Sequence, residues 1–448
     1  MLLWSKPTEK LYETPMVREM AQETLEKFEG ENKENNFKQT EIGLIPEDWE
    51  VVRLGEVCKI TMGQSPPSST YNDKGIGLPF LQGKAEFGEI YPRPVKYCSK
   101  PLKIAQEGDI LISVRAPVGD VNIAPFKCAI GRGLASIKPL NTERLLFLFY
   151  FLIYAKKRIE EEGTGSTFKA IRKSNLESFK IHLPPLSEQR KIARVLDRIQ
   201  QAIELQDRII EQAKNLKKTL MQKLFTEGLY GEEQKETEIG LIPKSWEVVR
   251  LGDYLELIKN GVTKKQNKKG IGLPVTRIET ISEGIIDVTK VGYINSLTPK
   301  EIEKYSLKIG DILFSHINSE PHLGKSAIYT GNPPTLIHGM NLLLIRAKKE
   351  QLDPFFLNNL FNWYRLRGIF IGIASRAVNQ SSINQGKMKN LLIPLPPLEE
   401  QKQIAHILSV VDEKIEVEQK RKQVLKELFK TMLHKLMSGE IRLKEVEI

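Results

Sequence analysis

The sequence predicts a mixed α+β protein that is built twice: two globular domains joined by two long helices, which pair as an antiparallel coiled coil. Two observations support this fold class. The stretch TEIGLIPEDWEVVRLGEV at Thr40 returns about 200 residues later as TEIGLIPKSWEVVRLGDY at Thr237. The stretches 186–227 and 398–438 contain no Pro or Gly and carry apolar residues at spacings of four and three. Each module therefore ends in a long helix.

The repeat extends beyond its opening phrase, and three further phrases recur in the same order. They are GIGLP at Gly75 and Gly270, GDIL at Gly108 and Gly310, and LPPLSEQRKIARVLD at Leu183, which returns as LPPLEEQKQIAHILS at Leu395. The lengths between the phrases differ, so a common frame holds two different interiors. We expect a pseudo-two-fold protein, in which one chain imitates a symmetric dimer.

The front part of each module is predicted to be a globular α+β domain. GDILISV, GDILFSHI and NLLLIRA are short β runs between turns rich in Pro, Gly and Asn. ERLLFLFYFLIYAKKRIEE and PFFLNNLFNWYRLRGIF predict one matching helix in each copy. The expected segments are an unassigned N-terminal tail or helix (1–37), a first globular domain (38–182), a first long helix (183–227), a linker with the second globular domain (228–394), a second long helix (395–440) and a C-terminal tail (441–448).

The long helices are expected to bury their apolar stripes against each other. A helix of ~40 residues is ~60 Å long, which is more than one domain can cover. The alternative is that each helix packs only within its own domain. In the paired arrangement the globular domains would lie at opposite ends of the helices. The predicted seam residues are Ile192, Leu196, Ile199, Ile203, Ile210, Leu220, Leu224, Ile404, Leu408, Val411, Ile415, Leu425, Phe429, Met432 and Leu436.

Composition favours a soluble protein that binds a polyanion. The net charge is +11, and Lys and Arg displace counterions from phosphate, so nucleic acid is the simplest partner. The three cysteines have an odd count and no CxxC spacing, which indicates buried thiols rather than disulfides or a zinc site. No apolar run is long enough for a membrane span, and MLLWSKPTEK is too short for a signal peptide. We expect a cytoplasmic protein with no membrane partner.

Together the duplicated TEIG-IP-W phrase, GDIL in each module and LPPL-EQ before each long helix resemble the specificity subunits of type I restriction-modification systems, over about residues 38–445. The resemblance implies two target recognition domains that read the halves of a bipartite, asymmetric site in double-stranded DNA. The coiled coil would set the length of the unread spacer. Two methyltransferase subunits would dock on the helices and methylate adenine, with room for two restriction-translocase subunits.

The resemblance also implies that this chain is not an enzyme and holds no cofactor. S-adenosylmethionine, ATP and Mg would belong to the partner subunits. One alternative function is a stand-alone regulator that binds a bipartite DNA site without enzymatic partners; another is a scaffold that binds no DNA. Co-purification from the native host would separate these alternatives, because only the restriction-modification subunit would bring a methyltransferase with it.

Several strings imitate catalytic motifs without completing them. GNPPT at Gly331 has Thr335 where an adenine methyltransferase has an aromatic residue. HLGKSA at His322 has Ser319 where a phosphate-binding loop needs glycine. His316, His322 and His338 lack the spacing of metal ligands on one element, so packing or polar contacts are the more ordinary interpretation. We predict neither a catalytic nor a metal site.

The DNA-binding candidates come from segments that differ between the copies, because readers of different sequences should carry different polar side chains. The alternative is that these segments are solvated turns. One segment follows the opening phrase, another precedes each Leu-Pro-Pro, and Arg115 and Asn318 follow GDIL. The candidates are Gln64, Ser65, Ser69, Tyr71, Arg115, Thr167, Lys169, Arg172 and Lys173 in the first copy, and Asn260, Thr263, Lys264, Lys265, Gln266, Asn318, Arg376, Asn379, Gln380 and Lys387 in the second, together with Arg132 and Arg277.

Overall fold

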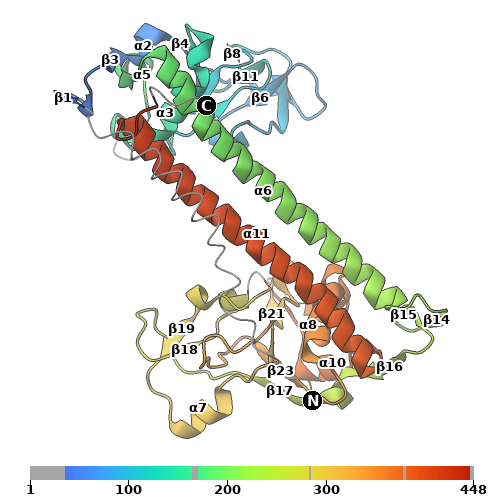
Figure 1. The fold of residues 1–448 in the computed structure, drawn as a ribbon. Coiled ribbons are helices and arrows are strands. Elements are labelled where there is room, and N and C mark those ends of the chain that lie inside the picture. Colours follow the sequence, from blue (N-terminus) through green and yellow to red (C-terminus); the bar gives the residue numbers. More distant parts are fainter. Residues whose placement is uncertain (1–35, 164–169, 282–283, 377–379, 444–448) are drawn as a thin grey trace. The chain divides into compact units, whose positions relative to one another are not determined.

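The computed structural model describes residues 36–163, 170–281, 284–376 and 380–443 (Figure 1). The chain forms two compact units: the first consists of Met1–Arg208 and Gln419–Ile448, and the second of Ile209–Glu418. Each boundary falls inside a long helix, α6 (Leu186–Glu227) or α11 (Leu398–Ser438), so each unit contains one half of both helices. No helix in the described ranges combines the length and apolarity of a membrane span.

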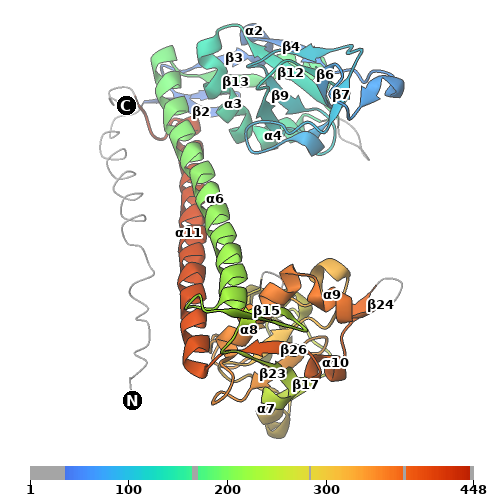
Figure 2. The same ribbon diagram turned by 90° about the vertical axis from the view of Figure 1, so that its right-hand side faces the viewer.

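The two long helices run antiparallel, as predicted. They are continuous over 42 and 41 residues. In the first unit, Ile192 near the start of α6 shares a core with Leu436 near the end of α11. In the second unit, Leu224 near the end of α6 shares a core with Ile404 near the start of α11. Figure 2 shows the helix halves within each unit lying next to each other.

Both helices also form ion pairs with each other. Asp207 pairs with Lys422 in the first unit, and Lys217 pairs with Asp412 in the second, at 2.6 Å. The predicted seam residues are buried or partly buried, but several also contact the globular cores, so their assignment to a helix-helix seam stays a prediction. The buried ones are Ile192, Leu196, Ile203, Ile210, Leu224, Ile404, Leu408, Met432 and Leu436, and the partly buried ones are Ile199, Leu220, Val411, Ile415, Leu425 and Phe429.

Apart from its halves of the long helices, the first unit is mainly β-structure with short helices. Its strands are β1 (Phe37–Thr40), β2 (Gly43–Pro46), β3 (Glu50–Arg53), β4 (Cys58–Met62), β5 (Tyr71–Asn72), β6 (Leu78–Leu81), β7 (Lys96–Cys98), β8 (Ile104–Ala105), β9 (Ile110–Ser113), β10 (Val121–Ile123), β11 (Cys128–Ile130), β12 (Leu134–Pro139) and β13 (Lys180–Leu183). Its short helices are α2 (Leu54–Val57), α3 (Leu145–Tyr154), α4 (Lys156–Glu161) and α5 (Lys173–Ser178).

The second unit repeats this composition. Its strands are β14 (Gln234–Thr237), β15 (Gly240–Pro243), β16 (Glu247–Arg250), β17 (Leu255–Asn260), β18 (Leu273–Val275), β19 (Gly292–Ile294), β20 (Ile312–Phe314), β21 (Ile317–Asn318), β22 (Ser326–Ile328), β23 (Leu343–Ala347), β24 (Ser375–Arg376), β25 (Ser381–Ser382) and β26 (Leu392–Leu395). Its short helices are α7 (Pro299–Tyr305), α8 (Pro354–Leu366), α9 (Ile369–Ile373) and α10 (Gln385–Lys389).

A four-stranded antiparallel sheet recurs with one topology. Its order is β10-β9-β12-β4 in the first unit and β22-β20-β23-β17 in the second. The predicted GDIL strands, β9 and β20, occupy equivalent places. Both units also join their beginning to their end through a two-stranded sheet, β3 with β13 and β16 with β26. The shared phrases thus build a frame that brings the two ends of each globular part together at the start of a long helix.

A buried tryptophan fastens this frame to the long helix. Trp49, directly before β3, donates from Nε1 to the Glu188 carboxylate at 3.1 Å. Trp246, before β16, donates in the same way to Glu400 at 2.9 Å. Both indoles are fully buried, and both carboxylates lie in the first turn of their helix. The helix dipole favours a carboxylate there. The repeated Trp and the repeated L-EQ phrase therefore form the same hydrogen bond in each unit.

A backbone N–H also donates to the other oxygen of each glutamate, from Leu443 in the first unit and from Leu229 in the second, and the first unit adds an arginine. In the first unit Arg442 donates to both oxygens of Glu188 at 2.8 Å and also to Asp48 at 2.9 Å. In the second unit the backbone N–H of Leu229 donates to Glu400 at 3.0 Å. The segment expected as a C-terminal tail thus begins with three buried residues, Ile441 to Leu443, because Arg442 must reach a buried carboxylate.

We predict that Arg442→Ala lowers the free energy of unfolding of the chain by about 3–5 kcal/mol, because it leaves the Glu188 carboxylate buried without its cation. Urea unfolding of the full chain measures this loss. The control is Lys430→Ala, which removes an exposed cation from the same helix end. Equal midpoints for the two variants would show that the Arg442 pair does not stabilise the first unit.

Candidate nucleic-acid interface

Polar loops gather at one edge of the four-stranded sheet in the first unit, where β4 and β9 end and β12 begins. We call this the loop edge. The Gly63 N–H donates to Leu134 O at 2.9 Å, and the Val114 N–H to Gly133 O at 2.9 Å. The Ile171 N–H donates to Val114 O at 3.0 Å, so the segment before α5 joins the same edge. Backbone hydrogen bonds therefore join four separate segments of the chain, those at Gly63, Val114, Gly133 and Ile171.

The second unit builds the same loop edge where β17 and β20 end and β23 begins. The Val262 N–H donates to His338 O at 2.9 Å, and the Ile383 N–H donates to His316 O at 2.8 Å. Here the segment before α10 adds a small three-stranded ribbon of order β21-β25-β24. The frame is shared, but the loops presented on it differ in length and sequence.

Glycines permit the close approach of backbones at this edge. A Cβ on Gly63 would lie 2.1 Å from Gly131 O, and a Cβ on Gly261 would lie 2.2 Å from Gly339 O. Gly131 in turn lies against Gln82, and Gly339 against Thr276. We call these four residues, Gly63 with Gly131 and Gly261 with Gly339, the glycine crossing. It fixes the backbone from which the edge side chains project.

Several predicted DNA-binding residues lie at the loop edges and are exposed. In the first unit these are Gln64, Arg115 and Arg172, with the partly exposed Ser65, whose Oγ accepts from the Arg132 N–H at 3.2 Å. In the second unit Asn260 and Thr263 are exposed around the end of β17, and Gln380 is exposed beside β25. Asn318 is partly exposed in β21, with its Nδ2 on Ser315 Oγ at 3.2 Å.

Other predicted residues are engaged with neighbours within their own unit. Tyr71 stacks on Phe80 at 4.6 Å between ring centroids and donates to Pro66 O at 2.8 Å. Lys264 pairs with Glu301 at 2.7 Å. Lys387 donates to Ile373 O at 2.7 Å. A positive side chain already held by a carboxylate or carbonyl has less to gain from phosphate.

The remaining predicted residues have mixed surroundings. Lys173 pairs with Glu177 at 3.1 Å, and Arg376 pairs with Glu320 at 3.1 Å. Gln266 accepts from Arg277 at 3.3 Å. Ser69 and Lys265 are exposed. Thr167, Lys169 and Asn379 lie outside the described residues. The DNA-binding role of all of these side chains stays a prediction.

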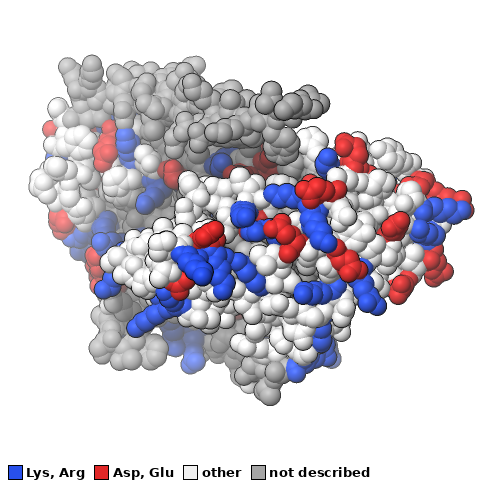
Figure 3. Space-filling model, turned by 90° about the horizontal axis from the view of Figure 1, so that it is seen from below, with Lys and Arg blue, Asp and Glu red and all other residues white. Residues whose placement is uncertain are grey.

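Charge on the second unit is mixed rather than gathered. In the view of Figure 3, lysine and arginine side chains lie among aspartates and glutamates. Any polyanion on this face would therefore meet individual cations beside carboxylates rather than one continuous basic surface. Such an arrangement favours positioned contacts over purely electrostatic adhesion.

The titratable residues in the interior support the frame. Asp311 of the second GDIL phrase holds Arg346 through two hydrogen bonds of 2.6 and 2.8 Å, and Asp109 of the first accepts from Ser136 at 2.6 Å. Burial lowers the pKa of His338 to about 4 and also lowers the pKa of His316. Over the described ranges, no three His, Cys, Asp or Glu side chains are grouped as metal ligands. The three cysteines are buried thiols.

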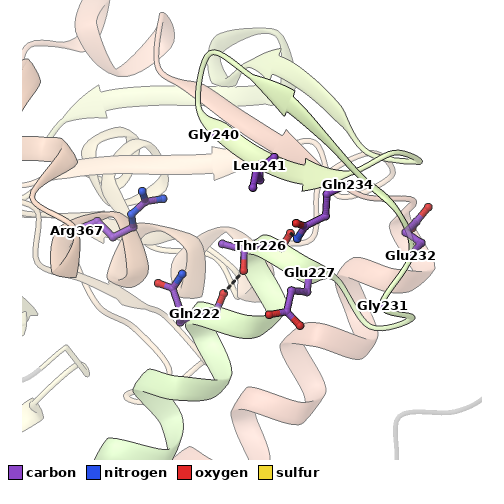
Figure 4. A pocket seen from close by; sticks show the side chains of 9 residues that line it. All are labelled: Gln222, Thr226, Glu227, Gly231, Glu232, Gln234, Gly240, Leu241 and Arg367. Atoms are coloured by element: carbon purple, nitrogen blue, oxygen red, sulfur yellow. Dashed lines mark hydrogen bonds between the residues drawn. The ribbon is translucent and has the colours of Figure 1, made fainter.

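A pocket of about 590 Å³ lies at the end of α6 in the second unit (Figure 4). Gln222 and Thr226 of α6 face Leu241 of the β14–β15 hairpin and Arg367 beyond α8. Gln234 closes one side by donating to Thr226 O at 2.8 Å. The hairpin and the helix belong to the shared frame, so this pocket is separate from the loops that differ between the units.

The structure adds one edge residue that the sequence analysis missed. Gln82 follows β6, is exposed, and accepts from the Gly133 N–H at 3.2 Å. The sequence does contain a hint of this residue. Gln82 stands at the same position after GIGLP in the first copy as Arg277 does in the second. That correspondence carries information only once the two strands are known to be equivalent.

The comparisons with known proteins agree with this architecture. A family model described as "Type I restriction modification DNA specificity domain" matches residues 46–215 and 243–427. The MjaVIII type I specificity subunit of Methanocaldococcus jannaschii is 27% identical over 92% of this chain and 98% of its own length. A chain assigned as the MjaX specificity subunit of the same organism is 57% identical, over 47% of this chain and about half (49%) of its own length. A crystal structure of the S subunit from M. genitalium superposes with a TM-score of 0.57 at 16% identity, over 91% of this chain and 97% of that one.

We predict that Gly63→Ala lowers the free energy of unfolding by about 1–3 kcal/mol, because the added methyl group overpacks the glycine crossing against backbone atoms that cannot rotate away. The matched control is Gly83→Ala, since a Cβ on Gly83 meets nothing within 4 Å. Thermal unfolding of the full chain measures both. If the two variants unfold at the same temperature, the crossing tolerates side chains and does not fix the edge.

Proposed function

Because the chain belongs to the family of type I restriction-modification DNA specificity subunits, we propose that it reads a bipartite, asymmetric target in double-stranded DNA, one half with each unit. Members of the family recognise a DNA sequence and are not themselves catalytic. The first recognition domain spans about residues 38–182, and a linker with the second recognition domain spans about residues 228–394. The paired helices set the length of the unread DNA between the halves.

One observation carries the proposal: the frame of the two units is the same, and the side chains on the two loop edges differ. Identical edges would suit a palindrome, because symmetric readers bind symmetric half-sites. Here the first edge presents Gln64 and Arg115, and the second presents Asn260 and Gln380. Asn, Gln and Arg are the side chains that pair with base edges in the major groove. Because the two loop edges differ, the two halves of the DNA target would have different base sequences.

The partner subunits carry the chemistry in this proposal. Two methyltransferase subunits dock on the long helices and methylate adenine in the target, using S-adenosylmethionine. Restriction-translocase subunits with ATP and Mg complete the assembly in the cytoplasm. Support comes from apolar side chains on the helices that are about half exposed, namely Leu205 (54%), Leu216 (53%) and Val410 (50%). Such residues are typical of surfaces that a protein partner covers.

We predict that exchanging residues 45–182 for the corresponding segment of a related subunit replaces one half of the methylated target and leaves the other half unchanged, because each edge is built within its own unit. Long-read detection of modified adenines in the host genome measures the target. The matched control exchanges residues 243–394 and should replace the opposite half. A change of both halves by either exchange would contradict independent reading.

We also predict that inserting four residues beside Gln206 alters the spacer or prevents assembly, and does not change the letters read. Four residues add about 6 Å of helix, roughly one turn. The insertion also displaces the Asp207–Lys422 pair between the two long helices. The same mapping of modified adenines reports spacer and letters together. New letters at an unchanged spacer would contradict a role of the helices in spacing.

A further inference from the structure

We infer that Gln82 and Arg277 are equivalent specificity-determining residues, one in each unit, and that Gln82 selects adenine in one half-site whereas Arg277 selects guanine in the other. The inference rests on the proposed function and deepens it.

The equivalence is set by the backbone. Phe80 pairs in parallel with Ala129 in the first unit, and Val275 pairs in parallel with Ile337 in the second. Each pair lies two residues before the position in question. The same GIGLP phrase precedes both strands. Gln82 and Arg277 therefore occupy equivalent positions, two residues after this parallel pairing.

The glycine crossing fixes this position at both loop edges. In the first unit Gly131 lies against the Gln82 backbone, and the Gly133 N–H holds its carbonyl at 3.2 Å. In the second unit Gly339 lies against Thr276, the residue before Arg277, and its N–H donates to Thr276 Oγ1 at 2.8 Å. A reading side chain needs a rigid origin, because misplacement by about 1 Å already weakens a directed contact.

The Arg277 side chain is oriented by acceptors from its own unit. Nε and Nη2 donate to the Glu279 carboxylate at 3.3 and 3.1 Å, and Nη1 donates to Gln266 Oε1 at 3.3 Å. The Arg277 hydrogen bonds lower the pKa of Glu279, which keeps this carboxylate charged. Guanidinium has five N–H donors, so two are left for another partner. The side chain is about a third exposed (30%), so those donors can reach a ligand.

The hydrogen-bond donors and acceptors of each side chain determine which base it would recognise. Two N–H donors match the O6 and N7 acceptors of guanine, whereas an amide with one donor and one acceptor group matches N7 and N6–H₂ of adenine. Gln82 is exposed, and its amide can present both groups. The discrimination that one such pair supplies corresponds to a ratio of about 5- to 150-fold against the wrong base.

The test maps modified adenines in a host that carries the complete system with this chain as Arg277→Gln or Gln82→Arg. We expect Arg277→Gln to replace guanine by adenine at one position of one half-site. We expect Gln82→Arg to replace adenine by guanine at one position of the other half. Gln82→Ala should accept several bases at that same position. Lys300→Gln, which removes an exposed cation of α7 from the same unit as Arg277, should leave the target unchanged.

Three results separate the inference from the function on which it rests. A wild-type system whose modified adenines show no bipartite motif overturns the proposed function. A bipartite motif that Arg277→Gln and Gln82→Arg leave intact overturns the inference alone. If a variant abolishes methylation, the purified complex is titrated with DNA carrying each base at each position. Discrimination lost at a single position supports base reading, and an equal loss of affinity for every sequence overturns it.

Discussion

The hydrogen bond between a buried indole and the first-turn glutamate of a long helix is the constraint on which the rest of this structure depends. Trp49 with Glu188 and Trp246 with Glu400 join the beginning of each globular part to the helix that leaves it. A buried carboxylate is costly unless every lone pair is satisfied, so the surrounding elements must also be in place. The opening hairpin, the two-stranded sheet and the helix start are thereby fixed as one body, and the four-stranded sheet can vary its loops without disturbing it.

The division between constant and variable parts follows from this constraint. The tryptophan, the glutamate and the glycines of the crossing are the same in both copies. Residues that project from the loop edges are not, because nothing in the frame depends on their side chains. Gln82 and Arg277 illustrate the rule, since one backbone position carries an amide in one unit and a guanidinium in the other. The side chains of one loop edge can therefore change while the frame of that unit stays the same.

Much of the architecture could be predicted from the sequence. The absence of Pro and Gly between 186 and 227 predicted a long helix, and α6 ends at Glu227 because Gly228, at φ +69°, terminates it. The expected helix segment began at 183, whereas Leu183 ends strand β13 and α6 begins at Leu186, after Pro185. The GDIL strands and the duplicated frame could also be predicted from the sequence. Strands β5 and β8 were not, because two residues carry no periodicity. The Arg442–Glu188 pair spans 254 residues, and no local pattern reveals such a partner. Gln82 was missed because its place depends on the parallel pairing of β6 with β11.

The composition of the two units has a consequence for biosynthesis. The second unit is one continuous stretch, Ile209–Glu418, whereas the first combines the beginning of the chain with its last stretch. All residues of the second unit are therefore translated before the last stretch of the first unit. The earlier-made residues must wait for Met432, Leu436 and Arg442 to emerge before their core and their buried carboxylate are satisfied. The domain that is translated first is thus the one that matures last, and a prematurely terminated chain would leave that half exposed to proteases and chaperones.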